Sequence, residues 1–347
     1  MTGIDHLHIA RGTTASRVFA VLALAATVAL ATLPSWGAAS TQKKLIELLV
    51  LVALAQMWNL LAGFAGIVSV GQQAFIGFGA YGMVVFVNNL HANLYLSVLL
   101  AAFGTAVLSV PIGLVAFRLR GSYFAIGTWV LATLASLVVQ SINQVGGGSG
   151  ASIRVVGTKA LTRLHNNYWI ALVVGLGAVA IAYLVLRSRL GLQMQAIRDN
   201  EAGARSLGAN VYRTRFIVWV IASFWTGLAG ATFYLNNLRV QPTAAFNVLS
   251  WTAPIIFIVV IGGIGTIEGP IIGAVAYYVL KDRFSEAQTT YFIGLGLLAI
   301  VVAIWLKRGL WGLLRDRFGL SLFPVRRRVV GLADLGDRVD RAERVES

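Results

Sequence analysis

The sequence contains no cysteine and few charged residues, and each shortage excludes a class of protein. Without cysteine, the chain has no disulfide, thiolate metal site or cysteine nucleophile. Charged residues make up 12% of the 347 positions, against about 25% in soluble domains, while 58% are hydrophobic. Too few polar side chains remain to cover a water-facing surface. The composition therefore predicts an integral membrane protein and excludes the pair of soluble domains that the length alone would suggest.

Residue patterns that support catalysis or metal binding are also missing. The four histidines lie in polar ends or loops, and no group of Asp, Glu, His or Ser has catalytic spacing. A phosphate-binding P-loop needs Gly-Lys-Ser or Gly-Lys-Thr, yet none of the five lysines is followed by Ser or Thr. We therefore predict no catalytic residue, no metal site and no cofactor, and the chain cannot hydrolyse ATP by the P-loop route.

Long apolar stretches recur along the chain. A helix of roughly 20 mostly apolar residues crosses a bilayer core. The pattern predicts an all-α polytopic membrane protein with about ten transmembrane helices, some of them short. The predicted spans are 18–37, 45–63, 73–87, 94–117, 123–142, 168–186, 215–235, 250–262, 269–280 and 290–306. The first is also compatible with a cleaved signal peptide, because Arg11 and Arg17 precede an apolar run that ends in small residues.

The basic residues predict how the chain crosses the membrane. The 28 Lys and Arg outnumber the 13 Asp and Glu, an excess that in a soluble protein would indicate a nucleic-acid partner. With the N-terminus inside, and with Arg215 at the foot of its span counted as inner, 20 of the 28 fall on the inner side and eight on the outer side. The charge therefore indicates topology and no nucleic-acid partner. We expect a cytoplasmic segment 1–17, a membrane domain 18–306 with a cytoplasmic loop 187–214, and a basic tail 307–347. Both termini are then cytoplasmic.

Two regions of the spans are interrupted by glycine-rich breaks, within 59–81 and 262–273. Broken backbone survives in a membrane only where protein or a water-filled cavity surrounds it. Paired breaks in the two halves of a chain are typical of an internal repeat with a substrate path between the halves. We therefore assign a translocation path to Asn59, Ser69, Gln72, Gln73, Gly263 and Thr266. Four-residue spacing predicts one close-packing helix face from Gly265, Gly269 and Gly273.

Ionisable residues are nearly absent from the spans. Apart from Arg215 at the foot of its span, the exceptions are Glu47 and, in the second break, Glu268. Glu268 precedes a predicted helix, where the helix dipole favours a structural anion. Ionisable groups inside a membrane mark proton relays and ion sites. A neutral lining can pass a small polar or zwitterionic solute but offers no evident way to use a gradient, so we expect the energy to come from a partner.

The inner loop 187–214 is the expected docking site for that partner. Four apolar residues recur at helical spacing and predict an apolar stripe, namely Met194, Ile197, Ala204 and Leu207. Asp199 and Asn200 are candidates to cap a second short helix, and Gly208 supplies a helix stop. An amphipathic helix pair at this place either docks a partner or lies in the membrane interface.

Four ordered motifs carry a resemblance to a known family. They are Asn59-Leu-Leu-Ala-Gly63-Phe-Ala-Gly66 with Ser69-Val-Gly71, Arg118-Leu-Arg120-Gly-Ser-Tyr-Phe-Ala-Ile126, Arg198-Asp199-Asn200-Glu201 through Gly208, and Gly262-Gly263-Ile264-Gly265 through Gly269-Pro270-Ile-Ile-Gly273-Ala274. From about residue 45 to residue 310, the sequence resembles the permease subunits of branched-chain amino-acid ABC importers, of the M type of the high-affinity system.

The resemblance implies a multi-pass protein of the bacterial cytoplasmic (inner) membrane that carries branched-chain or other small amino acids. Its implied partners are a second homologous permease subunit, two cytoplasmic ATPase subunits and an external solute-binding protein. The segment 193–208 resembles the ATPase-coupling segment of the family, through Gln193, Ile197, Arg198, Asp199, Asn200, Glu201, Leu207 and Gly208. In the general importer motif a glycine follows the glutamate by six residues, whereas Gly208 follows Glu201 by seven, so the spacing differs from that motif by one residue.

Two alternatives stay open on the sequence. Permeases of the same importer class for urea, short amides or simple sugars are the first alternative, because selectivity can lie in the external binding protein. A gradient-driven secondary transporter also uses broken helices. Uptake that persists without ATP under an imposed gradient would distinguish the second alternative from an ATP-driven importer.

Overall fold

The computed structural model describes residues 8–10, 14–155, 157–284, 294, 296, 309–318, 323 and 328–330. The predicted span 290–306 and most of the basic tail lie outside these described residues. In the first half, the helices are α1 (Thr14–Trp36), α2 (Ala39–Asn59), the π-helix η1 (Leu60–Phe64), α3 (Gln72–Val84), the π-helix η2 (Val85–Asn89), α4 (Leu94–Ala116), α5 (Ser122–Ser141) and the 3-10 turns η3 (Asn143–Val145) and η4 (Gly147–Ser149).

The second half continues with helices joined by short connections. They are α6 (Ala160–Arg187), α7 (Arg189–Asp199), α8 (Glu201–Ser206), α9 (Val211–Asn237), α10 (Pro242–Ala245), α11 (Thr252–Gly262), α12 (Glu268–Phe284) and α14 (Gly309–Phe318). Two short antiparallel pairs accompany them, β1 (His8–Ala10) with β4 (Arg328–Val330) and β2 (Ala151–Ser152) with β3 (Arg239–Val240).

Five helices of the described part are long and apolar enough to cross a membrane, namely Ala39–Phe64, Leu94–Ala116, Ser122–Ser141, Ala160–Arg187 and Val211–Asn237. Shorter apolar helices cover Ala23–Trp36 and Thr252–Gly262. The chain is therefore an all-α polytopic membrane protein. Helix α6 begins at Ala160, eight residues before the predicted span at 168, because helical hydrogen bonding continues past the apolar stretch into polar residues.

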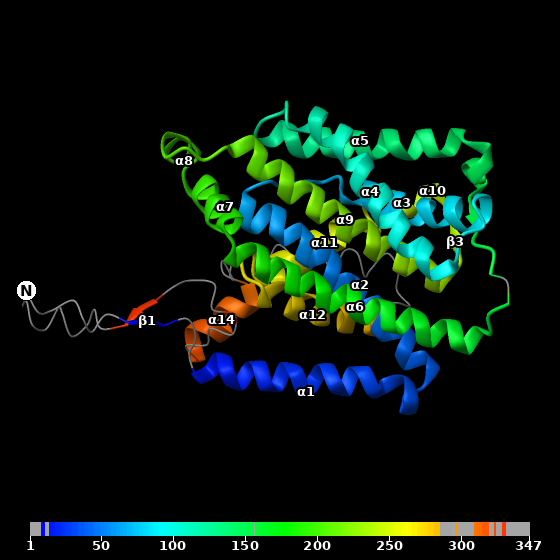
Figure 1. The fold of residues 1–347 in the computed structure, drawn as a ribbon, viewed down its shortest axis with the longest axis horizontal. Helices are drawn as coiled ribbons and strands as arrows, with labels where there is room; N and C mark the ends of the chain where they lie inside the picture. The colour runs from blue at the N-terminus through cyan, green and yellow to red at the C-terminus, as the bar shows by residue number, and fades with distance from the viewer. Residues whose placement is uncertain are drawn as a thin grey trace, which may run out of the picture.

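The long helices run roughly alongside one another, with α1 and α5 on opposite sides of the bundle (Figure 1). Helix α2 packs against α6, α9, α11 and α12, and α3 packs between α4 and α9. In the most apolar stretch of α2, 83% of the residues are buried, against 22% in α5, so α2 is the centre of the bundle and α5 lies at its surface.

Small residues allow these helices to approach closely. A Cβ atom on Gly79 of α3 would lie 2.1 Å from the carbonyl oxygen of Gly227 in α9, so neither backbone could stay where it is. Such contacts are typical of membrane helix packing, where small residues bring backbones together.

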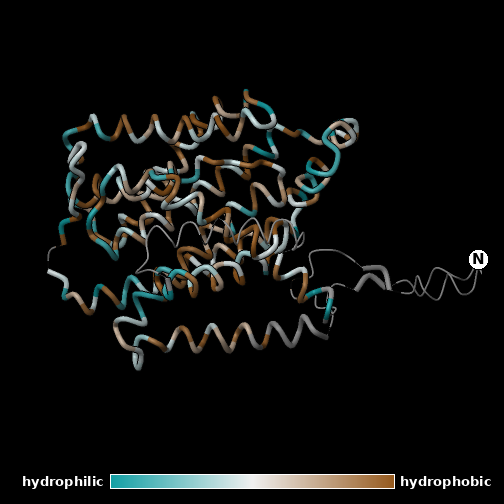
Figure 2. The backbone as a smooth tube through the Cα atoms, turned by 180° about the vertical axis from the view of Figure 1, so that it is seen from behind, coloured by the Kyte–Doolittle hydropathy of each residue, from teal (hydrophilic) through white to brown (hydrophobic). Residues whose placement is uncertain are grey.

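The two ends of the bundle differ in structure. Helices α7 and α8 lie at one end, together with β1, while β3 and α10 lie at the opposite end (Figure 1). Hydrophobic residues predominate along the long helices, and hydrophilic residues gather toward both ends (Figure 2). This distribution fits a bundle that crosses a bilayer along the direction of its long helices.

Candidate functional site

The first glycine-rich break follows the π-helix η1, and residues 65–71 then lead to the start of α3 at Gln72. Backbone groups of the break are bonded by other residues: the Trp58 indole N–H donates to the Ser69 carbonyl oxygen at 2.8 Å, and the Val70 N–H donates to the Thr128 hydroxyl at 3.1 Å. Because the neighbouring helices satisfy these groups, the break can lie inside the protein without the cost of unpaired backbone.

The second break is a glycine turn between α11 and α12. Gly263 and Gly265 both adopt positive φ angles, of 129° and 75°. The Thr266 hydroxyl donates to the Gly263 carbonyl oxygen at 2.7 Å and accepts from the Gly269 N–H at 3.1 Å, so it closes the turn at the start of α12.

The structure corrects one detail of the predicted glycine face. Helix α12 begins at Glu268, so Gly265 lies in the preceding turn and does not share a helix face with the other two glycines. Its positive φ angle, which favours glycine, explains why glycine stands there. Gly269 and Gly273 do pack closely: a Cβ atom would lie 2.3 Å from the Gly263 carbonyl oxygen at the first and 2.0 Å from that of Ile258 at the second.

A single buried side chain joins the two breaks. The Asn59 amide nitrogen donates to the Thr266 carbonyl oxygen at 2.7 Å, and its amide oxygen accepts from the Gly265 N–H at 2.8 Å. Asn59 is fully buried, so both hydrogen bonds form away from water. An amide fits here because it offers a donor and an acceptor on one rigid group.

Arg198, near the end of α7, reaches the same place. Its Nη1 donates to the Gly63 carbonyl oxygen at 2.7 Å, while its Nε and Nη2 donate to Asp199 at 3.0 Å each. Gly63 belongs to η1, and the last carbonyls of a helix have no partner within it. We call the group Asn59, Gly63, Arg198, Gly265 and Thr266 the coupling junction. It connects α7 directly to the first break and, through Asn59, to the second.

The local structure of α7 and α8 agrees with the sequence prediction. The Asn200 side chain caps α8 by accepting from the Gly203 N–H at 2.9 Å, and Gly208 ends it with a φ angle of 84°. Of the four residues in the predicted apolar stripe, Met194, Ile197 and Ala204 are buried within the chain. Leu207 is not: it is 89% exposed, because the chain bends at Asn200 and α8 ends at Ser206, which breaks the helical phase.

Other predicted coupling residues bind α9. The Gln193 side-chain oxygen accepts from the Thr214 hydroxyl at 3.1 Å. Glu201 forms ion pairs with Arg205 at 2.6 Å and with Arg215 at 2.9 Å. Sequence reasoning assigned neither Thr214 nor Arg215 to this site, although Arg215 stands at the foot of a predicted apolar span.

The predicted path residues lie between packed helices. Ser69, Gln72 and Gln73 are buried, like Asn59. The Gln72 side-chain oxygen accepts from the Thr226 hydroxyl at 3.3 Å, and Gln73 exchanges hydrogen bonds with Thr252 through its N–H and its side-chain oxygen. These contacts join α3 to α9 and to α11.

The two acidic residues of the spans both have partners. Glu47 forms an ion pair with Lys281 of α12. Glu268 is the first residue of α12, and its side chain accepts from the Phe323 N–H at 3.0 Å. This is the position in which the positive end of the helix dipole favours an anion.

Comparison with known proteins identifies the family. The profile described as "Branched-chain amino acid transport system / permease component" matches residues 44–314. The chain belongs to this family. Its members are transport subunits of importers and not enzymes, and the matched region contains both breaks, α7, α8 and the coupling junction.

Three relatives show the range of the similarity. The permease protein LivM of the high-affinity branched-chain amino acid transport system of Salmonella typhimurium is 23% identical, over 76% of this chain and 68% of the relative. The nucleoside ABC transporter permease protein NupC of Lactococcus lactis is 27% identical, over 55% of this chain and 66% of the relative. The ribose import permease protein RbsC of Escherichia coli is 27% identical, over 38% of this chain and 42% of the relative.

Proposed function

We propose that this permease forms the translocation path of an ATP-driven importer for branched-chain or other small amino acids in the bacterial cytoplasmic membrane. It works with a second homologous permease, two cytoplasmic ATPase subunits and an external solute-binding protein. The match of residues 44–314 to the branched-chain amino acid family and the similarity to LivM support this solute class. The near absence of ionisable residues from the spans supports an external source of energy.

The coupling junction is the observation that carries the mechanism. ATP binding draws the ATPase subunits together, α7 and α8 move with them, and Arg198 transmits the movement to η1 through the Gly63 carbonyl oxygen. Asn59 links η1 to the turn before α12, so both breaks respond together. The central path thereby opens alternately to the two sides of the membrane.

The docking face is the exposed side of α7 and α8. Leu192 and Leu207 are 64% and 89% exposed there, and the Asp199 and Arg205 side chains are also largely open. Exposed leucines beside charges suit a groove on a protein partner. On this proposal α7 and α8 are cytoplasmic, as are both termini, with ten spans in all and the two breaks in corresponding positions of an internal repeat.

The coupling proposal is tested by Arg198→Gln in the complete importer reconstituted in liposomes. A hydrogen bond from a charged group contributes about 1.5–3 kcal/mol. Because about 1.4 kcal/mol corresponds to a factor of ten, we expect leucine uptake to fall roughly ten- to hundredfold, while the ATPase subunits still co-purify. Arg239→Gln is the control, because Arg239 is exposed in β3, at the end of the bundle opposite α7 and α8 (Figure 1). Equal uptake by wild type and Arg198→Gln would exclude transmission through this residue.

The docking proposal is tested by Leu207→Glu. A buried glutamate at a partner interface is costly, so the ATPase subunits should no longer co-purify. Leu249→Glu is the control, since Leu249 is exposed in the segment before α11, away from α7 and α8. Retention of the ATPases by Leu207→Glu would place the docking face elsewhere.

Permeation of a sugar or a nucleoside is the second candidate, favoured by the similarity to RbsC and NupC. Uptake of leucine, ribose and uridine by the complete importer, each with and without ATP, separates the candidates. Leucine uptake that requires ATP supports the proposed function. Uptake of ribose or uridine without uptake of leucine would contradict the proposed solute class. Uptake driven by a gradient without ATP would contradict the proposed ATP-driven mechanism.

A further inference from the structure

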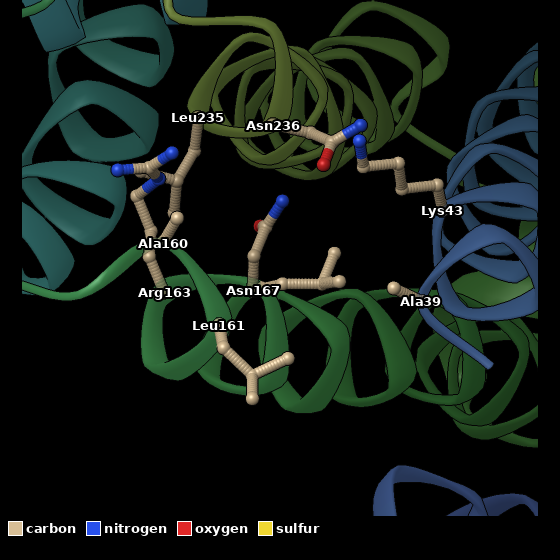
Figure 3. A pocket seen from close by; sticks show the side chains of 9 residues that line it. Ala39, Lys43, Ala160, Leu161, Arg163, Asn167, Leu235 and Asn236 are labelled. Carbon is tan, nitrogen blue, oxygen red and sulfur yellow. The ribbon is translucent and has the colours of Figure 1, made fainter. Parts of the chain in front are cut away.

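A cleft of about 280 Å³ opens between three helices at the end of the bundle opposite α7 and α8. It lies among the first turns of α2 and α6 and the last turn of α9. In Figure 3, the polar ends of Lys43, Arg163, Asn167 and Asn236 surround the open space. Leu164 and Leu235 add apolar surface to the same lining.

The charge in this cleft is positive and unbalanced. Within the described part of the chain, neither Lys43 nor Arg163 forms an ion pair, and no acidic residue lines the cleft. Glu47, which follows Lys43 on α2, is neutralised by Lys281, and Asp282 of α12 is neutralised by Lys44. Two cations that share a cleft repel each other, so an anion between them would be attracted to both.

Two helix N-termini add to this positive potential. Helix α2 starts at Ala39 and α6 at Ala160, and both residues line the cleft. The residues that precede these helices, Ala38 and Lys159, give no side-chain cap to either. Uncapped N-termini present unbonded N–H groups and the positive end of the helix dipole, which together favour anions.

The buried amide of Asn167 is the independent observation that points to a ligand. Asn167 is 1% exposed, and neither its side-chain nitrogen nor its oxygen has a hydrogen-bond partner among the described residues. Its amide points into the cleft (Figure 3). Buried amides are nearly always bonded, so an unpaired one at the floor of a cationic cleft indicates a donor group held ready for an acceptor.

We propose that this cleft binds a small oxyanion, a carboxylate or phosphate oxygen group attached to an apolar body. Lys43 and Arg163 bind the charge, the Asn167 amide donates to an oxygen, and Leu164 and Leu235 contact the apolar part. The oxyanion comes from a free carboxylate in solution or from the headgroup of an anionic lipid. The site does not depend on which solute the importer carries.

The test uses the full chain in nanodiscs and isovalerate labelled with ¹³C at its carboxylate. In zwitterionic lipid, we expect saturable broadening of the carboxylate signal, and at least a tenfold weaker affinity in the double variant Lys43→Gln with Arg163→Gln. Lys44→Gln removes a neighbouring cation that is paired with Asp282 and does not line the cleft, and should bind as wild type does.

A second arm replaces part of the lipid by phosphatidylglycerol. Loss of isovalerate binding in wild type, with enrichment of phosphatidylglycerol around wild type but not around the double variant, assigns the site to a lipid phosphate. Retention of isovalerate binding assigns it to a free carboxylate. Equal isovalerate binding by wild type and double variant, or no binding of either anion, overturns the proposal.

Asn167→Leu gives a readout that a purely structural role would not produce. It should weaken isovalerate binding at least tenfold and at the same time raise the unfolding temperature of the unliganded chain, because an unpaired buried amide is replaced by an apolar group of similar size. A lowered unfolding temperature with unchanged binding would show that the amide serves packing alone.

Discussion

The cations of the coupling junction and the cations of the cleft, at opposite ends of the helix bundle, differ in their partners. At the α7–α8 end, Arg198 is bonded to Gly63 and Asp199, and Arg215 is paired with Glu201, so these cations hold helices together. At the opposite end, Lys43 and Arg163 line an open cleft and have no ion pair within the described residues. Bonded cations define a mechanical connection, whereas unpaired cations around a cleft define a place for a ligand.

The largest expected effect comes from exchanging asparagine for leucine at each end. Asn59→Leu leaves the Gly265 N–H and the Thr266 carbonyl oxygen unpaired, at a cost of about 3 kcal/mol in the free energy of unfolding. Asn167→Leu removes an amide with no partner in the described part and should stabilise by about 1 kcal/mol. Unfolding of the detergent-solubilised chain in a denaturant series measures both. Opposite signs of the two changes in the free energy of unfolding would support the contrast between the bonded and the unpaired amide. Destabilisation of similar size by both variants would contradict it.

Gly269→Ala tests how tightly the second break is packed. The added methyl group would lie 2.3 Å from a backbone carbonyl oxygen, which cannot rotate away as a side chain can. We expect a loss of about 2 kcal/mol, in the usual range for overpacking. Gly104→Ala in α4 is the control, because the new Cβ atom would meet nothing within 4 Å and alanine favours a helix. The unfolding temperatures of both variants test this prediction. An unchanged unfolding temperature for Gly269→Ala would mean that the turn has room to relax.

These contacts mark the limit of what the sequence could predict. Apolar length and positive charge predicted the membrane helices, and local chemistry predicted the cap at Asn200 and the stop at Gly208, because such signals lie within a few residues. The junction could not be derived in this way: the residues that Asn59 joins are over 200 positions away, and Gly63 is 135 positions from Arg198. Their pairing depends on how the helices pack, which periodicity does not encode.

Leu207 is exposed, unlike the other three residues of the apolar stripe, for a related reason. Counting residues at helical spacing assumes one continuous helix, whereas α7 ends at Asp199 and α8 is only six residues long. The cleft escaped sequence reasoning altogether, since its lining comes from three helices whose ends meet only in the folded chain. The sequence signal that could have indicated the cleft was the presence of single cations at the ends of apolar helices. Membrane topology explains such cations equally well, so they did not indicate a binding site.

Glu201→Gln should have a smaller effect than the two changes above. Its carboxylate is partly exposed and pairs with two arginines, so losing the charge costs about 1 kcal/mol. Arg205→Gln removes only one of the two pairs and should cost about half as much. Because salt screens such pairs, the difference between Glu201→Gln and wild type should shrink in about 1 M sodium chloride. A difference that salt does not change would mean that Glu201 acts through packing.

Substitution of the adjacent residues Lys43 and Lys44 on α2 should have the smallest effect on stability. It also compares a paired cation with an unpaired one most directly. Lys44 pairs with Asp282 on the exposed surface, and such a pair contributes about 0.5 kcal/mol or less, so Lys44→Gln should lower stability slightly and leave anion binding unchanged. Lys43 has no such pair in the described structure, so Lys43→Gln should leave stability unchanged and weaken isovalerate binding. Measuring unfolding and binding for both variants separates a cation that holds the fold from one that holds a ligand. If the two variants behave alike in both measurements, the distinction between bonded and unpaired cations fails at this end of the bundle.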